Sequence, residues 1–138
     1  MLPQTTEEIQ VMADTVRLEK NKELVRRFME LLIDPATADE GGALATDTYI
    51  QHNPNIASGR QAIVDWVKTD QAERARSGMR PVGEPFLMAE GDRVVMMLKR
   101  EVPHPSRPGE FYTSYWFDMW RIEDGKLAEH WDGAPLEA

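Results

Sequence analysis

The sequence predicts an α+β fold, in which N-terminal helices pack on a strongly curved antiparallel sheet and leave a cone-shaped pocket. Up to about residue 78, apolar residues recur at helical spacing. From residue 81 onwards the pattern becomes extended, with β-branched, aromatic and methionine residues in four runs. Helices followed by a run of strands are typical of the α+β class. At 138 residues the chain fits one domain, 1–138, with residues 1–20 as an N-terminal helical extension.

The first helical segment should begin after Thr5, because Thr5 and Glu8 have the spacing of a capping box. It should end at Asp34, since a residue that precedes proline disfavours the α conformation. The pattern leaves open whether residues 6–34 form one helix or two. The apolar residues at helical spacing in its second half are Leu24, Val25, Phe28, Leu31 and Leu32.

A loop, PATADEGGAL, and a short extended piece, TDTYIQHNP, come next. Ser58 and Gln61 have the spacing of a second capping box, so we expect a helix there that ends near Gly78 and Pro81. The four runs after it, PVGEPFLMAE, DRVVMMLKREV, FYTSYWFDMWRIE and KLAEHWDG, are predicted strands. Gly91-Asp92 and Asp124-Gly125 are predicted hairpin turns.

Composition excludes several kinds of protein. The chain has no cysteine, so thiolate catalysis, zinc–thiolate sites and iron–sulfur clusters are ruled out. Its net charge of −8 disfavours nucleic acid as a partner. No run is long and apolar enough for a membrane span, and the acidic start lacks the pattern of a secretory signal. We therefore expect a cytoplasmic protein, and the absence of phosphate-loop and dinucleotide motifs predicts no cofactor.

The last hairpin carries the candidate chemistry. On the third of these runs, FYTSYWFDMWRIE, the residues Trp116, Asp118 and Trp120 share one face, and on the last run Ala128, His130 and Asp132 share one face. Neither face of the longer strand is plainly polar. We therefore expect helices to cover one face and a partner subunit to cover the other, which predicts a homodimer.

Two turns compete in this hairpin. A two-residue type I′ loop at Asp124-Gly125 would place Asp118 opposite Trp131. A type I turn with a bulge at Gly125 would place Asp118 opposite His130, and Trp116 opposite Asp132. We favour the bulge at Gly125, because it gathers the polar groups where each finds a partner, and unpaired buried carboxylates are costly.

The segments YIQHNP, GRQAIVDWV, AEGDRVVM and FDMWRIEDGKLAEHWD resemble the SnoaL-like polyketide cyclases of the nuclear transport factor 2-like superfamily. The resemblance spans roughly residues 20–132, and it implies a deep apolar pocket, commonly in a homodimer. It also implies that Asp132 is the general acid/base of an aldol closure and that Asp118 lines the pocket. The cyclases have histidine where this chain has Asp118, and a β-branched residue follows their HWD where this chain has Gly133.

The expected catalytic residues are therefore Asp132, Asp118 and His130. Burial beside Trp116 would destabilise the ionised form of Asp132 and suit it to proton transfer, although a structural carboxylate at the sheet end is the alternative. His130 either orients Asp118, donates to substrate or simply pairs with a carboxylate. The expected substrate-binding residues, with core or turn roles as alternatives, are Tyr49, His52, Asn53, Trp66, Trp116 and Trp120. We expect no metal, because His52, His130 and Asp132 could form a site only if the fold joins them.

The leading hypothesis is a cofactor-independent cyclase, isomerase or dehydratase acting on a small apolar substrate that bears a carbonyl. One alternative is a dimeric module of the same fold that binds a hydrophobic ligand without turnover. The other is a hydrolase similar to limonene epoxide hydrolase, in which an arginine bridges two aspartates. The second alternative is the weaker one, because Arg100 and Arg121 are expected near strand ends.

Overall fold

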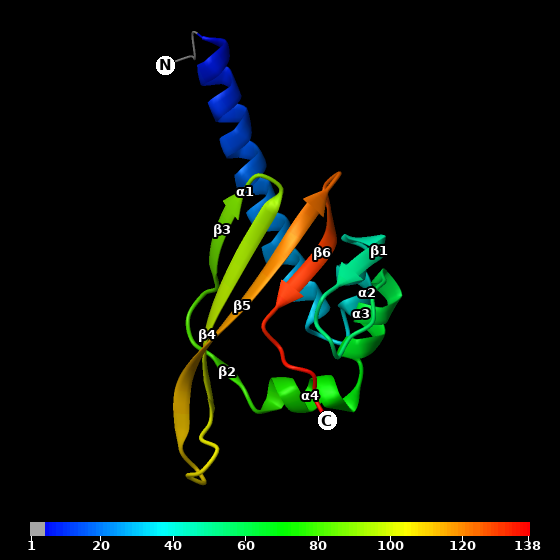
Figure 1. The fold of residues 1–138 in the computed structure, drawn as a ribbon, viewed down its shortest axis with the longest axis vertical. Coiled ribbons are helices and arrows are strands. Elements are labelled where there is room, and N and C mark those ends of the chain that lie inside the picture. Colours follow the sequence, from blue (N-terminus) through cyan, green and yellow to red (C-terminus); the bar gives the residue numbers. More distant parts are fainter. Residues whose placement is uncertain (1–4) are drawn as a thin grey trace.

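A computed structural model describes residues 5–138 and confirms the α+β class (Figure 1). Residues 1–4, the start of the expected extension, lie outside the described residues. The helices are α1 (Thr6–Leu32), α2 (Ala38–Gly42), α3 (Arg60–Val67) and α4 (Asp70–Ser77). The strands are β1 (Ala45–Gln51), β2 (Arg80–Pro81), β3 (Phe86–Glu90), β4 (Arg93–Pro103), β5 (Phe111–Glu123) and β6 (Lys126–Asp132). None of the helices within residues 5–138 is long and apolar enough to cross a membrane.

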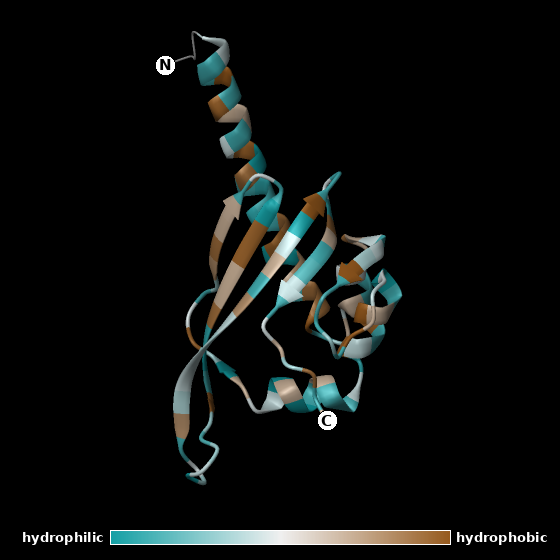
Figure 2. Cartoon of the chain, viewed as in Figure 1, coloured by the Kyte–Doolittle hydropathy of each residue, from teal (hydrophilic) through white to brown (hydrophobic). Residues whose placement is uncertain are grey.

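Helix α1 is one continuous helix, which settles the question that the sequence left open. It begins with the expected capping box: Thr5 Oγ1 accepts the Glu8 N–H, and the Glu8 carboxylate accepts the Thr5 N–H, each at 3.0 Å. Its C-terminal half lies against the sheet, whereas its N-terminal half projects beyond it (Figure 1). The projecting half carries apolar residues as well as polar ones (Figure 2).

The middle of the chain differs from the prediction. Helix α3 begins after Gly59 and has no side-chain cap, because Ser58 Oγ accepts the Gln51 N–H at 2.9 Å instead. The expected capping box of Ser58 is therefore wrong. The single expected helix is also two helices, since the Thr69 hydroxyl accepts the Ala72 N–H and starts α4. The short helix α2 lies in the stretch expected to be a loop.

The sheet has the strand order β1-β6-β5-β4-β2, and β3 also pairs with β4. The four predicted strands are present, but β1 pairs with β6 in parallel, so the sheet is antiparallel except at this pair. This pairing has no local signal in the sequence. It places Gln51 beside His130 and thus joins two segments almost eighty residues apart.

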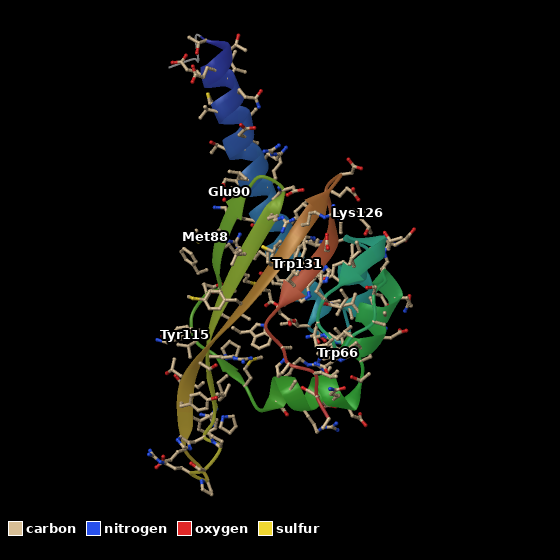
Figure 3. All side chains as sticks on the ribbon, viewed as in Figure 1. Trp66, Met88, Glu90, Tyr115, Lys126 and Trp131 are labelled. Atoms are coloured by element: carbon tan, nitrogen blue, oxygen red, sulfur yellow. The ribbon has the colours of Figure 1, made fainter. Side chains whose placement is uncertain are left out.

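The two faces of the sheet have different surroundings. On the inner face, which packs against α1, lie Val94 and Met96 of β4 and Trp120 and Ile122 of β5, all buried. The outer face carries the alternate side chains of the same strands. Four of its apolar or aromatic side chains are more than half exposed, namely Phe86, Met88, Tyr115 and Phe117. Figure 3 labels Met88, Tyr115 and Trp131 on β3, β5 and β6.

The β5–β6 hairpin has a two-residue turn and a bulge further along. Glu123 pairs with Lys126, and Asp124 and Gly125 have φ values of 49° and 74°, as a type I′ turn requires. The predicted bulge at Gly125 is therefore wrong. The register shifts instead between Ile122, which pairs with Leu127, and Arg121, which pairs with Glu129, so Ala128 is the extra residue.

The bulge at Ala128 returns His130 and Asp132 to the same face of the sheet as Asp118. With the two-residue turn alone, they would have pointed to the opposite face. A register slip of one residue turns a strand's side chains to the other face, whereas a slip of two keeps the face. Asp118 lies opposite Asp132 and Trp120 lies opposite His130, two residues from the expected pairing. Asp118, His130 and Asp132 therefore share the inner face as predicted, with different direct partners.

Candidate active site

Asp118, His130 and Asp132 form a compact cluster on the inner face. His130 Nε2 lies 2.9 Å from Asp118 Oδ1 and 3.9 Å from Asp132 Oδ2. The three side chains are 8%, 9% and 5% exposed, in the order Asp118, His130, Asp132. Because a buried charge without a partner is strongly unfavourable, the imidazole between two carboxylates explains how all three remain in the interior.

Gln51 fixes the protonation of His130 at its other ring nitrogen. Gln51 Oε1 accepts the backbone N–H of Asn53 at 2.9 Å, which identifies that atom as the amide oxygen. His130 Nδ1 lies 2.6 Å from the same oxygen, so Nδ1 carries a hydrogen and donates it. Gln51 was absent from the residues expected at the site, although alternation along β1 places it two residues from Tyr49 on one face.

A second hydrogen must lie between His130 and Asp118. A ring-nitrogen lone pair and a carboxylate oxygen would repel each other at 2.9 Å, so either Nε2 or Asp118 carries a proton there. The indole N–H of Trp116 also points to Asp118 Oδ1, at 3.3 Å. The His130–Asp118 pair therefore holds a proton within reach of a second carboxylate, which is the arrangement that proton transfer needs.

Asp132 is held by donors from two loops. Asn53 Nδ2 donates to Asp132 Oδ2 and the Ala134 N–H donates to Oδ1, each at 2.9 Å. Asn53, expected as a possible substrate contact, thus orients a candidate catalytic carboxylate. These two hydrogen bonds fix the orientation of the Asp132 carboxyl group and leave other lone pairs on its oxygens without a donor among them.

Aromatic rings close the deep side of the cluster. Trp120 is 1% exposed, and its ring centre lies 5.1 Å from that of His130. Tyr49 is equally buried, and its hydroxyl accepts the Trp120 N–H at 3.1 Å. Burial raises the pKa of the Tyr49 hydroxyl well above its usual range, and the bond from Trp120 lowers it only in part. Tyr49 and Trp120 are therefore core residues beneath the cluster, which is the alternative to the substrate-binding role expected for them.

Two other expected site residues lie apart from the cluster. His52 is on the outer face, where its ring stacks on Trp131 at 4.9 Å and its Nε2 pairs with Glu129 at 2.7 Å. The fold does not bring His52 to His130 and Asp132, because His52 directly follows Gln51, the last residue of β1, and successive extended residues point to opposite faces. Trp66 projects from α3 and packs at the edge of the core, where its buried N–H has no partner among the described residues.

Exposure of the inner face changes along β5. On β5, Trp120 and Asp118 are buried, Trp116 is half-buried and Tyr112 is exposed. The inner face of β5 therefore becomes more exposed from the cluster towards the Trp116 end of the strand. Two surface hollows of about 500 and 560 Å³ lie elsewhere, one beside α4 and one between α1 and the strand turns, and the lining of neither includes the cluster.

The cluster also has the donor set of a cation site. One ligand atom from each of Asp118, His130 and Asp132 lies within 4.8 Å of the others. Carboxylate oxygens with an imidazole nitrogen suit a divalent transition metal, provided that the proton between His130 and Asp118 leaves. The three residues that could have formed a metal site only if the fold joined them, His52, His130 and Asp132, do not come together, since His52 faces away.

Solved structures share this fold at low sequence identity, and a search of the curated proteins found no match. A candidate polyketide cyclase from Xanthomonas campestris is 15% identical, with a TM-score of 0.58 over 83% of this chain and 90% of that chain. A second, from Bacillus cereus, is 19% identical, with a TM-score of 0.58 over 82% of this chain and 72% of that chain. An NTF2-like protein with a cystatin-like fold, from Novosphingobium aromaticivorans, is 15% identical, with a TM-score of 0.59 over 94% and 89%.

These structures confirm the nuclear transport factor 2-like fold that the resemblance implied. The family model of the SnoaL-like domain matches residues 25–130. The match runs from the last part of α1 to most of β6, and it leaves out the projecting half of α1 and the end of β6. The chain belongs to the SnoaL-like domain family.

Proposed function

We propose that this protein is a cofactor-independent enzyme that moves a proton on a small, largely apolar substrate bearing a carbonyl. Asp118, His130 and Asp132 are the proposed catalytic residues. The observation that carries the proposal is the buried cluster itself, in which His130 Nε2 lies 2.9 Å from Asp118 Oδ1 and 3.9 Å from Asp132 Oδ2. Candidate polyketide cyclases among the similar structures support the same class of chemistry.

In the proposed step, Asp132 accepts a proton from the carbon next to the carbonyl. The C–H bonding electrons form the enolate double bond, and the carbonyl oxygen takes up the negative charge. The proton shared by His130 and Asp118 is donated to that oxygen, which stabilises the enolate. Return of a proton at another carbon gives isomerisation, whereas attack of the enolate carbon on a second carbonyl closes a ring.

Exchange of α-hydrogens tests this step without knowledge of the natural substrate. We expect the protein in D₂O to accelerate deuterium incorporation into 2-tetralone, followed by proton NMR. Asp132→Asn should lower the enzyme-dependent rate by about 100-fold or more, the usual contribution of a general base. A normal rate in the Asn variant would show that Asp132 is not the base.

Two controls belong to that experiment. Asp124→Asn changes a carboxylate in the exposed turn of the same hairpin, where asparagine tolerates the positive φ of 49°, so the exchange rate should stay unchanged. Dialysis against EDTA should also leave the rate unchanged. A rate that falls on dialysis and returns with a divalent metal would instead assign the cluster to metal-dependent chemistry.

The binding module without turnover gives a different result. In that case neither the native protein nor Asp132→Asn accelerates exchange, and a hydrophobic carbonyl ligand raises the melting temperature of both equally. The buried, hydrogen-bonded cluster favours the enzyme, since a simple apolar binding site has no need of two buried carboxylates.

Epoxide hydrolysis is a second candidate, and one observation favours it. His130 lies between two aspartates, the place that the resemblance to limonene epoxide hydrolase assigned to an arginine. In this reaction one carboxylate would activate water while the other protonates the epoxide oxygen. Formation of the diol from limonene-1,2-epoxide, with no exchange of 2-tetralone, would support this candidate over enolisation.

We also propose that the outer face of the sheet is the interface of a homodimer. Phe86, Met97 and Phe117 lie side by side across β3, β4 and β5. The next row contains Met88, Val95, Met119 and Trp131. Contiguous exposed apolar surface of this kind on a sheet usually marks an interaction site.

A further inference from the structure

We propose that Arg100 binds a carboxylate of the substrate, so that the substrate class is a compact oxo acid. This inference rests on the proposed function, because it places the reacting carbon at the Asp118–His130–Asp132 cluster. Arg100 is the eighth residue of β4 and pairs with Ser114 of β5. Leu98 pairs with Trp116 and Met96 with Asp118, so Arg100 lies in the same inner-face line as the cluster.

Arg100 is a half-buried cation that lacks a counter-ion. No carboxylate within residues 5–138 lies within 4.0 Å of its guanidinium. Its Nη1 donates only to the sulfur of Met79, at 3.1 Å, and its buried Nε has no acceptor among the described residues. Thioether sulfur is a weak acceptor, and a buried N–H without a partner is unfavourable. Nε and Nη2 therefore have no acceptor among the described residues, and a carboxylate pairs with this edge of the fork once a covering side chain such as Trp116 or Met79 moves aside.

The chemistry of that edge selects a carboxylate. Two parallel N–H groups match the two oxygens of a carboxylate, which binds arginine in a bidentate manner. Trp116 holds the guanidinium 4.8 Å above its ring, and Met79 contacts it from β2's side of the strand through its sulfur, so two of its neighbours are apolar. A single cation in such surroundings suits a monoanion with an apolar body. The chain has an excess of acidic residues, with a net charge of −8, and yet none of those described pairs with Arg100. The missing partner is therefore a feature of this position and not of a shortage of carboxylates.

The same tryptophan sets the distance to the cluster. Arg100 lies over the Trp116 ring, and the N–H of that ring points to Asp118 at 3.3 Å. The guanidinium carbon and Asp118 are therefore at most roughly 10 Å apart, given the size of an indole ring. A substrate that pairs with Arg100 places its reacting carbon only a few bonds from its carboxylate. The greater exposure of the inner face towards the Trp116 end agrees with this orientation.

Matched aromatic probes test the inference by binding alone. We expect quenching of tryptophan fluorescence to give a Kd for 2-naphthoate at least tenfold below that for neutral 2-naphthamide. Arg100→Gln should weaken 2-naphthoate at least tenfold and remove the preference. Arg100→Lys, which keeps the charge but loses the fork, should retain only part of it.

Arg93 provides a matched control on the other face. Its guanidinium also lies 4.8 Å from a tryptophan ring, that of Trp131, but on the outer face beside Asp92. Arg93→Gln should leave the preference for naphthoate unchanged. Equal binding of both probes by the native protein, or a preference that survives in a folded Arg100→Gln variant, would overturn the inference.

A further variant separates this inference from the proposed function. Asp132→Asn should bind 2-naphthoate as the native protein does, although exchange of 2-tetralone is lost. If Arg100→Gln keeps the preference while Asp132→Asn loses exchange, the carboxylate subsite fails and the acid/base role stands. If Arg100→Gln loses the preference while Asp132→Asn exchanges normally, the subsite stands and the acid/base role fails.

Discussion

At the scale of single residues, Gln51 controls the protonation of the candidate catalytic histidine. Gln51→Leu removes the acceptor of His130 Nδ1–H and leaves a buried donor unpaired. The expected loss in the free energy of unfolding is about 1–3 kcal/mol, measured by urea denaturation. Nitrogen NMR of the His130 ring should show a changed tautomer in the same variant.

Gln61 supplies the comparison for that prediction. It lies on the exposed side of α3 and bonds only to Asp65, at 2.8 Å. Gln61→Leu should change the free energy of unfolding by no more than about 0.5 kcal/mol, as is usual for surface substitutions. Equal losses for Gln51→Leu and Gln61→Leu would contradict the role assigned to Gln51.

Glu129, on the outer face, predicts a pH dependence of stability. Hydrogen bonds from His52 and Arg121 lower its pKa below the ordinary value of 4.5. Because the folded protein binds this proton more weakly than the unfolded chain, the stabilisation is present above pH 4.5 and is lost as the pH falls through the folded pKa. Glu129→Gln should therefore cost about 1 kcal/mol at pH 7, and the difference from the native protein should shrink towards pH 4.

Glu123 tests whether any carboxylate near Arg121 gives a pH-dependent stabilisation like that of Glu129. It lies 3.6 Å from Arg121 Nη1 but is 59% exposed, whereas Glu129 is 17% exposed and has two partners. Glu123→Gln should change the free energy of unfolding by less than about 0.5 kcal/mol at either pH. A pH-independent loss in Glu129→Gln would show that its contribution comes from packing instead of charge.

At the scale of elements, the β5–β6 hairpin determines which side chains reach the site, and cross-linking can verify its register. The chain has no cysteine, so introduced pairs give an unambiguous result. Met119→Cys should form a disulfide with Trp131→Cys, because these residues lie directly opposite each other. Met119→Cys should cross-link less with His130→Cys, which would lie opposite residue 119 if the hairpin had no bulge. It should also cross-link less with Glu129→Cys, which would lie opposite residue 119 if the bulge were at Gly125. Faster oxidation of either alternative pair would disprove the bulge at Ala128.

The sequence predicted most strands and the shared face of the hairpin, but not its pairing. Alternation identifies which residues point the same way within a strand, and this placed Trp116 with Asp118 and His130 with Asp132. The position of the bulge was misjudged because the residues from Glu123 to Lys126 are compatible both with a type I′ turn and with a type I turn followed by a bulge at Gly125. One signal was present: Leu127 and Ala128 are consecutive apolar residues and both are buried, which interrupts strict alternation.

The other omissions at this scale come from contacts distant in sequence. The parallel pairing of β1 with β6 brings Gln51 and Asn53 to the cluster, and no local pattern in either segment indicates a partner. Arg100 does lie near a strand end as expected, three residues before the end of β4 at Pro103, but the sequence does not show which side chains share its face across the sheet. Its place in the inner-face line depends on pairing with β5 over the full strand.

At the scale of the whole molecule, two apolar surfaces have no partner within the described chain. One is the projecting half of α1, which exposes Ile9, Met12 and Val16 at helical spacing. The other is the outer face of the sheet. A lone helix of this length is only marginally stable in water, so the projecting half draws its order from the packed half to which it is joined. The outer face is broad and rigid, which makes it the better candidate for a subunit interface.

Substitution on each surface distinguishes the two. The native protein should sediment with the mass of two chains at micromolar concentration in analytical ultracentrifugation. Phe117→Lys, in the middle of the outer face, should raise the dimer Kd by at least 100-fold, since it buries an unpaired charge between the two sheets. Val11→Lys on α1 should leave the Kd unchanged. Loss of the dimer in Val11→Lys alone, or a native protein that stays monomeric, would assign the outer face another role.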